Sequence, residues 1–516
     1  MRFAVLDLGS TTFQILVTEA DEEGSLTPVL RDRVVLNLGM ALSAAGGRIP
    51  SNAAERAVDT VRRFRDLAER TGASRVLPIA TSALRDAGNR EELAALLGDA
   101  IGEPVRFIDG REEARLVFAG VRASVALGPG HTMLLDLGGG SLEVALADER
   151  GLRWGDSLPL GAGRLTAQVL RHDPPKRDER GEVRRRVLEA IAPLVDRMER
   201  DGTRPARCVV SGGTAGAFAR LLAVRRWEEP PASLNQLAMD VEEVRALGRE
   251  LASLDLDGRL RLEGIDERRA DLLPAGAIVL TTAASAFGVG SLLVSEFGLR
   301  EGVVLDALGL ASGPGPAPDE LRRRSVERLA RGWGADPAHV QTVSRLALRL
   351  FDGTAALHGL GAVERELLSY AALLHDIGVR ISPDRHHRHG AYLVEHAALK
   401  GFAPAEVARI ASIVRFQRGG DPRPSYPPFA RLSPKARERV ATLAGMLRVA
   451  HALGRGGEHD ARELSVTVGD RVRVGIVGTS NPRAAASEAA AAASLLSRAL
   501  GRDVTFADEL VARASA

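Results

Sequence analysis

Cysteine, lysine and aromatic residues are all scarce in this chain of 516 residues. The single cysteine, Cys208, excludes an internal disulfide and predicts a reducing, cytoplasmic setting. Lysine occurs only at Lys176, Lys400 and Lys435, so arginine carries nearly all of the positive charge. The aromatic share is 4%, and the 69 basic residues are dispersed among 67 acidic ones. We therefore expect no nucleic-acid binding, which needs a basic face or an aromatic platform.

Long uninterrupted apolar segments are equally rare. Asp7 interrupts the first apolar stretch too early for a secretory signal peptide, so we expect no export. The segment 272–294 is uncharged and long enough to span a bilayer, but Pro274, its glycines and its hydroxyl residues favour a buried core helix. At this length, the apolar share of 45% predicts several globular domains and no membrane association.

What the chain does contain is a repeated glycine-rich pattern. Residues 4–17 read AVLDLGSTTFQILV and residues 133–146 read MLLDLGGGSLEVAL, so that Asp7 matches Asp136, and the second copy adds Glu143. Each copy predicts a β-hairpin with a polar turn. Two such hairpins, about 130 residues apart, predict two related subdomains that face each other across a cleft and share one ligand.

The chemistry of these turns suits a phosphate chain. Glycine lets backbone N–H groups approach phosphate oxygens, and a carboxylate can hold a divalent cation that neutralises the same oxygens. A third turn, Gly212–Thr214, follows a strand and opens an apolar helix, whose N-terminus favours an anion. One such turn alone is usually an ordinary tight turn, but three together indicate a phosphate ligand with magnesium. The pattern resembles the fold shared by sugar kinases, actin and chaperone ATPases.

Two further segments help to separate a kinase from a phosphohydrolase. Arg85 lies just past the strand expected at 75–80, where its guanidinium could clamp a phosphate, although a solvated arginine at a helix start would look the same. The segment 109–121, DGREEARLVFAGV, places Glu112 and Glu113 in the first turn of an amphipathic helix. Acidic residues are common in a first helical turn because they interact favourably with the helix dipole. The two glutamates alone therefore do not indicate a catalytic role, and the other motifs of the chain must support one.

Together these segments resemble the family of exopolyphosphatases and guanosine pentaphosphate phosphohydrolases. Seven motifs follow the family's order between residues 1 and 306, namely DLGSTTF, ATSALRDA, GREEARL, DLGGGSLE, SGGT, LPAGA and LREGV. The resemblance implies an α/β fold with two actin-like, ribonuclease H-like subdomains, 1–127 and 128–308, facing a cleft. It also implies a homodimer, magnesium or manganese as the cofactor, and processive removal of terminal phosphate from inorganic polyphosphate.

The same resemblance implies roles for individual residues. Glu113 corresponds to the general base, which would deprotonate a water for in-line attack on the terminal phosphorus. Asp7, Asp136 and Glu143 correspond to the acids that hold magnesium. The implied phosphate-binding positions are Thr11, Arg85, Gly138, Gly139, Ser141, Gly212, Gly213 and Thr214. The family usually has Asn where this chain has Thr11, so we expect a difference in binding strength or chain-length preference.

Three other functions stay open at this point. Guanosine pentaphosphate as the substrate would use the same motifs, which do not separate it from polyphosphate. A non-catalytic sensor of polyphosphate or alarmone is less favoured, because a binder gains little from several acids near a polyanion unless metal intervenes. A sugar kinase is disfavoured, since neither a sugar pocket nor an adenosine loop is recognisable.

The second half of the chain has a different character. The segment 309–324 is rich in Gly and Pro and then charged, which predicts an interdomain linker. Apolar residues at helical spacing predict an all-α domain over 309–459, and two short strands with an alanine-rich helix predict a small α+β segment over 460–516. Within the helical domain, His375 and Asp376 followed by DRHHRHG resemble the His-Asp metal-dependent phosphohydrolase superfamily.

This second resemblance offers candidate metal ligands, with His375, Asp376 and His389 as the preferred set. The remaining candidates, as ligands or surface groups, are His358, His386 and His387. Gln417 stands where related domains often have a histidine. We therefore favour a degenerate domain, which docks the other half or guides an anionic chain, over a working second metal centre.

Overall fold

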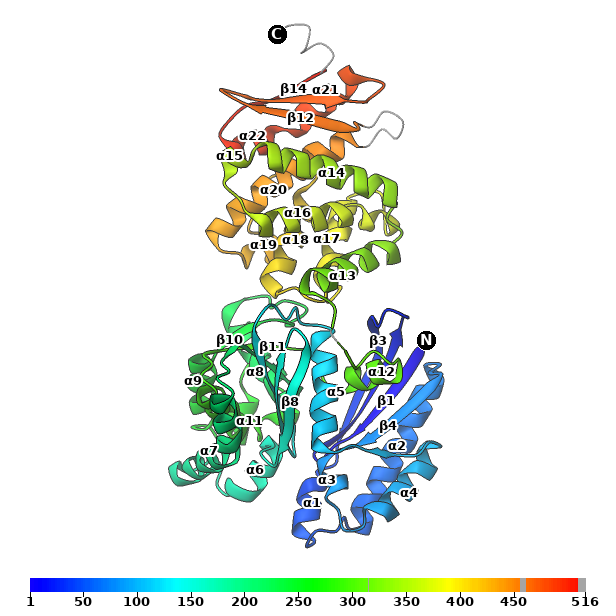
Figure 1. Ribbon diagram of the computed structural model, residues 1–516, viewed down its shortest axis with the longest axis vertical. Coiled ribbons are helices and arrows are strands. Elements are labelled where there is room, and N and C mark those ends of the chain that lie inside the picture. The colour runs from blue at the N-terminus through cyan, green and yellow to red at the C-terminus, as the bar shows by residue number, and fades with distance from the viewer. Residues whose placement is uncertain (314, 455–460, 509–516) are drawn as a thin grey trace. The chain divides into compact units, whose positions relative to one another are not determined.

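The computed structural model divides into two compact units (Figure 1) and describes residues 1–313, 315–454 and 461–508. The first unit comprises residues 1–228 and 234–318. The second comprises residues 229–233 and the described residues from 319 onward. The predicted boundary between residues 459 and 460 lies outside the described residues.

The first sheet of the first unit has the strand order β3-β2-β1-β4-β5, with β2 antiparallel and β4 parallel to β1. Alternate residues of β1 point to opposite faces, so that Leu6 packs against the surrounding helices and Val5 packs on the other side. The strands are β1 (Arg2–Leu8), β2 (Thr12–Ala20), β3 (Leu26–Val35), β4 (Arg75–Ala80) and β5 (Arg106–Phe107). The helices of this part are α1 (Leu38–Ala44), α2 (Ser51–Arg70), α3 (Ser82–Arg85) and α4 (Arg90–Ile101).

The second sheet has the order β10-β11-β9-β6-β7-β8 and repeats the plan of the first. Its central β6 is antiparallel to β7 and parallel to β9. The strands are β6 (His131–Leu137), β7 (Leu142–Asp148), β8 (Gly151–Leu158), β9 (Pro205–Ser211), β10 (Ala238–Asp240) and β11 (Ser291–Val294). The helices are α6 (Ala162–Val169), α7 (Arg177–Arg200), α8 (Gly212–Arg226), α9 (Val241–Leu251), α10 (Leu256–Leu260), η1 (Glu267–Arg269) and α11 (Leu273–Ala286).

Helix α11 settles the nature of the uncharged segment 272–294. It packs between α7 and α9 in the core beneath the second sheet, as the sequence predicts for a buried helix. Among the described residues, no helix combines the length and the apolar character that crossing a membrane requires.

The predicted hairpin repeat is confirmed residue by residue. Asp7 pairs with Gln14 across β1 and β2, and Asp136 pairs with Glu143 across β6 and β7. The turns match as well, because the N–H of Gly9 donates to the carbonyl of Thr12 at 3.2 Å and that of Gly138 to the carbonyl of Ser141 at 3.1 Å. Equivalent strands therefore deliver an aspartate and a tight turn to the same ends of the two sheets.

Two helices fill the space between the sheets (Figure 1), namely α5 (Gly110–Arg122) and α12 (Leu299–Ala307). Helix α5 packs Val117 toward the second sheet and Leu116 toward the first, while α12 packs back on α5 and β1. A Cβ at Gly302 would collide with the carbonyl of Leu116, so glycine permits the close helix crossing. Helix α5 is thus clamped on both sides, which fixes its N-terminal turn.

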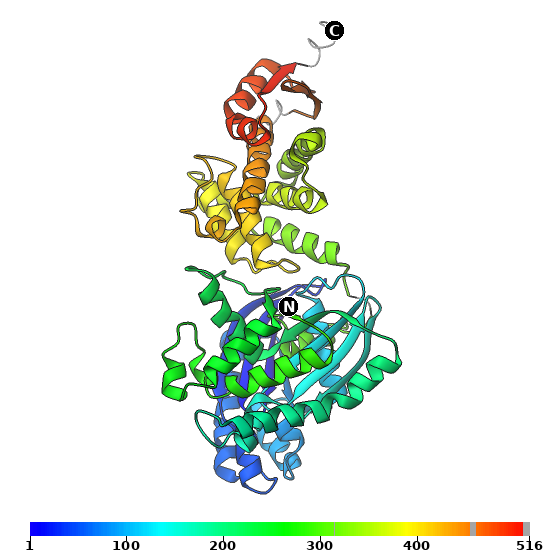
Figure 2. The ribbon, with the colours of Figure 1, turned by 90° about the vertical axis from the view of Figure 1, so that its left-hand side faces the viewer.

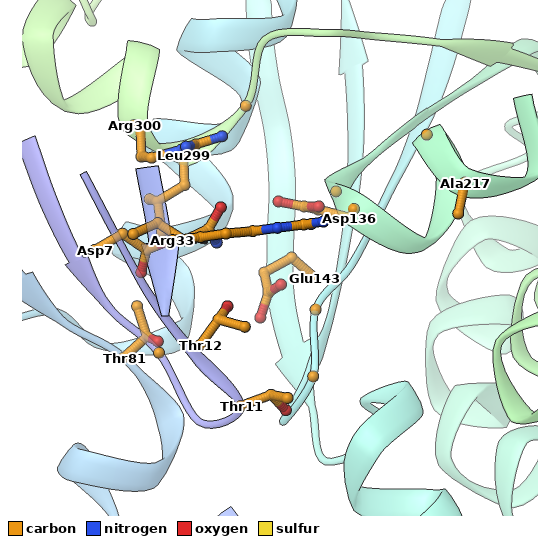
Figure 3. Close-up of a pocket in the computed structure, with 18 of the residues that line it drawn as sticks. Asp7, Thr11, Thr12, Arg33, Thr81, Asp136, Glu143, Ala217, Leu299 and Arg300 are labelled. Carbon is orange, nitrogen blue, oxygen red and sulfur yellow. Dashed lines mark hydrogen bonds between the residues drawn. The ribbon is translucent and has the colours of Figure 1, made fainter. Parts of the chain in front are cut away.

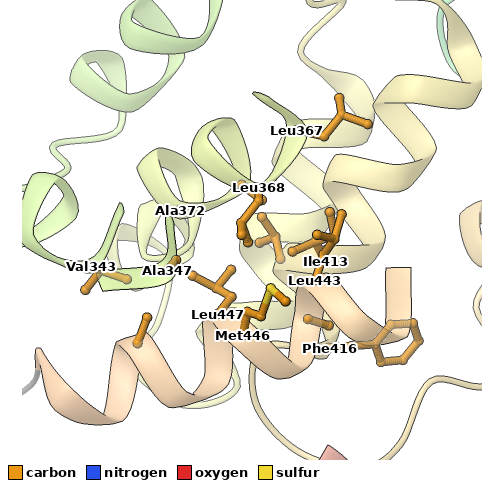
Figure 4. Packing of buried hydrophobic residues seen from close by; sticks show 14 of the residues in the cluster. Val343, Ala347, Leu367, Leu368, Ala372, Ile413, Phe416, Leu443, Met446 and Leu447 are labelled. Atoms are coloured by element: carbon orange, nitrogen blue, oxygen red, sulfur yellow. The ribbon is translucent and has the colours of Figure 1, made fainter. Parts of the chain in front are cut away.

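The second unit begins with a helical bundle, as predicted, whose apolar residues form one core (Figure 4). Helices α14, α16, α18 and α20 supply most of that core, including Leu368, Ile413 and Met446. The helices are α13 (Pro318–Gly332), α14 (Pro337–Gly353), α15 (Ala355–His358), α16 (Ala362–Leu374), η2 (Ile377–Arg380), α17 (His386–His396), α18 (Pro404–Phe416), α19 (Pro427–Ala430) and α20 (Pro434–Leu453).

A small three-stranded sheet completes the described part of the second unit (Figure 2). Its strand β12 contacts α14, and the accompanying helices α21 and α22 contact α20. Its order is β12-β13-β14, with an antiparallel and a parallel pair. Val472 and Leu496 belong to the same core as the helical bundle, so these elements continue that core instead of forming one of their own. The elements are β12 (Glu463–Val468), β13 (Val472–Val477), α21 (Pro482–Ala492), α22 (Ser494–Leu500) and β14 (Val504–Asp508).

Candidate active site

A pocket of about 420 Å³ opens in the first unit where the two hairpin turns face each other (Figure 3). Most of the site residues predicted from the sequence meet there. Those that line the pocket are Asp7, Thr11, Glu113, Asp136, Gly138, Gly139, Ser141, Glu143, Gly212 and Gly213. The repeat therefore brings two distant turns to one cavity.

The two hairpin turns touch each other directly. A Cβ at Gly139 would collide with the hydroxyl of Thr11, and one at Gly140 would collide with the hydroxyls of Ser10 and Ser82. Bare backbone is therefore required on the second turn, and all three of its glycines, Gly138, Gly139 and Gly140, line the pocket. Thr11, at the position where the family usually has Asn, fills the space beside this backbone.

The third turn is equally constrained. Gly212 has φ +87°, and a Cβ there would lie 2.5 Å from Oδ1 of Asp136. Because only glycine adopts this left-handed conformation at low cost, it allows α8 to start immediately beside the acid. The first turn of α8, with Gly213 and Gly216, faces the pocket and presents the positive end of the helix dipole to it.

Four of the carboxyl groups that line this pocket, those of Asp7, Glu113, Asp136 and Glu143, have raised pKa values. Burial raises the pKa of Asp7 and of Asp136 to about 6, with Asp136 also subject to repulsion from Asp7. Burial, followed by repulsion from Asp136, raises the pKa of Glu143 to about 7. The pKa of Glu113 is raised well above its usual range, first by burial and then by the charge of Glu143. Protons or a cation must therefore neutralise part of this cluster.

Glu113 is positioned by the start of α5. The Asp109 side chain caps the helix by accepting a hydrogen bond from the backbone N–H of Glu112 at 2.8 Å. Glu113 then lies in the first turn, 5% exposed, and lines the pocket. The preceding residue, Glu112, instead forms an ion pair with Arg115 at 2.8 Å and does not line the pocket. The pattern GREEARL thus places one acid inside and its neighbour outside.

Arg85 and Thr214 were both predicted to bind phosphate, but neither side chain lines the pocket. Arg85 Nη1 donates to the carbonyl of Ile108 at 2.8 Å and to Oε2 of Glu113 at 3.3 Å. Its guanidinium therefore lies behind the candidate base, where it opposes the rise in the pKa of Glu113. Thr214 is fully buried in α8 and packs against Gly276.

Two family models match this sequence. The model of the Ppx/GppA phosphatase family matches residues 16–311, and that of Ppx/GppA phosphatase domain III matches residues 321–473. The chain belongs to the Ppx/GppA phosphatase family. The resemblance inferred from the seven motifs is thereby confirmed, and so are the hydrolase class and the actin-like fold.

Named relatives of this Ppx/GppA phosphatase are exopolyphosphatases. Exopolyphosphatase 1 of Mycobacterium tuberculosis is 31% identical over 347 residues, which cover 67% of this chain and 98% of that protein. Exopolyphosphatase 1 of Mycobacterium leprae is 32% identical over 308 residues, which cover 60% of this chain and 90% of that protein.

Solved structures show the same fold. An exopolyphosphatase from Cytophaga hutchinsonii is 25% identical with a TM-score of 0.55, covering 60% of this chain and 98% of that one. The Ppx/GppA family member from Aquifex aeolicus is 24% identical with a TM-score of 0.52, covering 60% of this chain and 97% of that one.

Several arginines of this Ppx/GppA phosphatase line the pocket, although sequence reasoning gave them no role. Arg33 extends from β3 into the pocket (Figure 3). Its Nη2 donates to both carboxylate oxygens of Asp266 at 2.8 Å. Arg269 is buried, which lowers its pKa, and a Cβ at Gly213 would collide with its guanidinium. Arg300, within the motif LREGV, faces Asp7 and Asp136 and lowers the pKa of both. These arginines place positive charge among the acids of the pocket.

The candidate second site in the helical unit is only partly assembled as predicted. His375 and Asp376 do lie together, but the side chains that join them are His339 and His451. His389 is not part of this group. The prediction selected His389 because it is close in sequence, whereas the fold recruits residues from other helices.

Proposed function

We propose that this chain is an exopolyphosphatase, which hydrolyses the terminal phosphoanhydride bond of inorganic polyphosphate and acts processively. The observation that carries the proposal is the placement of Glu113. It is a buried carboxyl group that lines a pocket formed by two facing glycine turns and the start of a helix. The 31% identity to an exopolyphosphatase supports the choice of substrate.

In the proposed reaction, the terminal phosphoryl group sits between the two turns. The backbone N–H groups of Gly139 and Gly140 and the first turn of α8 bind its oxygens, and Arg300 and Arg33 offset its charge. Glu113, in its carboxylate form, accepts a proton from the attacking water while the water adds to phosphorus in line with the leaving oxygen. Catalysis then rests on positioning and electrostatics, and no covalent enzyme intermediate is required.

We also propose magnesium, or manganese in its place, as the cofactor. Asp7, Asp136 and Glu143 offer only carboxylate oxygens, which are the donors that hard divalent cations prefer. When bound, the cation would supply positive charge that neutralises the phosphate oxygens. Among the described residues, these acids do not form one tight cluster of ligand atoms. That spacing fits a magnesium ion whose coordination is completed by water and substrate, as is usual for phosphate-transferring sites.

A phosphate-release assay tests the proposal. Long-chain polyphosphate, and guanosine pentaphosphate in a parallel reaction, are supplied to the purified chain with magnesium or with a chelator. We expect magnesium-dependent release from polyphosphate that falls by at least about 100-fold in Glu113→Gln, since general-base catalysis contributes that much. Glu112→Gln is the matched control, because Glu112 adjoins the candidate base but points away from the pocket.

Three results would change the assignment. Faster release from guanosine pentaphosphate would make that compound the substrate. Tight binding of both compounds with no release would identify a sensor. Equal activity of Glu113→Gln and Glu112→Gln would remove Glu113 as the base. We further propose a homodimer, on the family resemblance, and a cytoplasmic location, on the single cysteine. Sedimentation velocity tests the first and cell fractionation the second.

A further inference from the structure

Three helices of the second unit bring a second group of chemically active side chains together. His339 lies in α14, His375 and Asp376 follow α16, and His451 lies in α20. One ligand atom from each residue falls within 4.8 Å of all the others. Among the described residues, this is the one group of three or more His, Cys, Asp or Glu side chains with such spacing.

Hydrogen bonds fix the direction in which two of these imidazoles present their lone pairs. His375 Nδ1 lies 2.7 Å from the carbonyl of Ala372, which can only accept, so this nitrogen carries the proton. His451 Nδ1 lies 2.6 Å from Oε1 of Gln417 and donates to it. The Gln417 amide is oriented by its own Nε2, which donates to the carbonyl of His375 at 3.0 Å. His375 and His451 therefore both carry a proton on Nδ1, which makes Nε2 the nitrogen with which each ring can bind a metal.

The remaining contacts bring further lone pairs to the same point. His339 Nε2 lies 3.2 Å from His375 Nε2 and 3.2 Å from Oδ2 of Asp376. The other carboxylate oxygen, Oδ1 of Asp376, is buried without a hydrogen bond from the described residues, and His386 Nε2 lies 3.3 Å from it. Acceptors that face one another in this way in a partly buried group repel unless a proton or a cation lies between them.

The spacing suits a metal ion. Ligands bound at about 2.1 Å to one tetrahedral ion lie about 3.4 Å apart. The separations of 3.2–3.4 Å among His339, His375 and Asp376 match this value, and His451 lies within 4.8 Å of them. We propose that His339, His375, Asp376 and His451 hold one divalent first-row transition ion, such as Zn²⁺, Fe²⁺, Mn²⁺ or Co²⁺. Three imidazoles and a single carboxylate favour these ions over magnesium, which prefers oxygen ligands.

Gln417 has a defined part in this site. The sequence suggests a lost ligand at this position, but the amide instead links His375 and His451 and fixes the proton of the latter. It thus acts as the outer hydrogen-bonding partner that metal-binding histidines usually have. Gln417 and His451 also line a pocket of about 660 Å³ together with Arg418 and Arg448, which gives the ion a route in.

This inference does not depend on the proposed exopolyphosphatase reaction, and metal binding tests it directly. The full chain is stripped with a chelator and titrated with Co²⁺ in excess magnesium, which occupies sites built from oxygen ligands. Visible absorption reports imidazole-bound Co²⁺, and elemental analysis after gel filtration gives the stoichiometry. We expect one Co²⁺ per chain. In the double variant His339→Gln, His375→Gln the affinity for Co²⁺ should fall by more than about 100-fold, because the loss of a residue that only hydrogen-bonds to a ligand already costs about 10–100-fold.

The matched control is His389→Gln, a histidine of the same unit outside the group. It should bind Co²⁺ like the wild type. Circular dichroism checks the fold of each variant, and the single variant His339→Gln is used if the double variant does not fold. The proposal is overturned if the wild-type chain binds no Co²⁺, or if His389→Gln weakens binding as much as His339→Gln does. Glu143→Gln should keep the Co²⁺ spectrum while losing phosphate release, which separates this site from the cleft.

Discussion

Arg85 Nη1 lies 3.3 Å from Oε2 of Glu113 and 2.8 Å from the carbonyl of Ile108. The arginine is therefore held behind the candidate base and does not face the pocket. Its positive charge lowers the pKa of Glu113 against the larger effect of burial, which raises it. Arg85 thus holds Glu113 in place and favours its carboxylate form.

The first prediction concerns Arg85→Gln. Loss of the guanidinium removes the charge that favours the carboxylate form, so the acidic limb of the kcat profile should move to higher pH. Near neutral pH we expect kcat to fall roughly tenfold, the size of one charge-assisted hydrogen bond, and to recover in part at alkaline pH. Phosphate release measured across the pH range checks this. A raised KM with an unchanged pH profile would instead show that Arg85 binds the phosphate of the substrate.

The second prediction concerns stability and pH. The pKa of Glu143 is raised to about 7 by burial, so above its unfolded value the folded chain binds more protons than the unfolded chain. The free energy of unfolding therefore falls as the pH rises through the window from about 4.5 to about 7. Glu143→Gln removes this effect, and we expect it to stabilise the metal-free protein by on the order of 3 kcal/mol at alkaline pH and little near pH 4.

Urea unfolding of the chelated protein at several pH values measures this difference. Glu112→Gln is the control, because Glu112 lies in an ion pair with Arg115 outside the pocket, and it should show no gain at alkaline pH. Magnesium should stabilise the wild type and have a smaller effect on Glu143→Gln, since the cation binds only the folded site. If the free energy of unfolding changed equally with pH in the wild type and in Glu143→Gln, the raised pKa of the buried Glu143 would be contradicted.

The sequence predicts those parts of the site that lie on a local pattern. Asp7 and Asp136 were recognisable because each occupies the same place in a repeated strand, turn and strand, and the observed registers agree. The side-chain partners across long sequence separations were not recognisable. Arg33 and Asp266 meet only because the two sheets face each other, although the alternation of Arg31 and Arg33 on one strand hinted at a basic face.

The group of histidines in the second unit was likewise only partly predictable from the sequence. The adjacent pair His375 and Asp376 is visible in the sequence, but His339 and His451 join it from helices whose order in space depends on core packing. A search restricted to neighbouring histidines therefore selects His389, which lies outside the group. Periodicity predicts which helices form, whereas the crossing of α14 with α16 and α20 decides which of their side chains meet.

The third prediction concerns Gly212→Ala. The residue has φ +87°, and the added Cβ would lie 2.5 Å from Oδ1 of Asp136, so the variant strains the backbone and displaces an acid of the pocket. We expect a loss of about 1–3 kcal/mol in stability together with loss of phosphate release. Gly216→Ala, in the same helix with nothing within 4 Å of its added Cβ, should instead gain up to about 1 kcal/mol. Thermal unfolding of both variants tests the contrast, and equal stabilities would contradict it.

The last prediction separates the two interpretations of Gln417. A lost ligand would leave an amide that does nothing for metal binding, so Gln417→Leu would bind Co²⁺ like the wild type or better. An amide that accepts from His451 Nδ1 at 2.6 Å holds that ring in the tautomer that binds metal. We therefore expect Gln417→Leu to lower Co²⁺ affinity about 10–100-fold, and Gln417→Glu, which keeps the acceptor, to lose less. Because both variants retain His339, His375, Asp376 and His451, a large loss in the leucine variant alone would show that the hydrogen bond, and not the ligand set, is responsible.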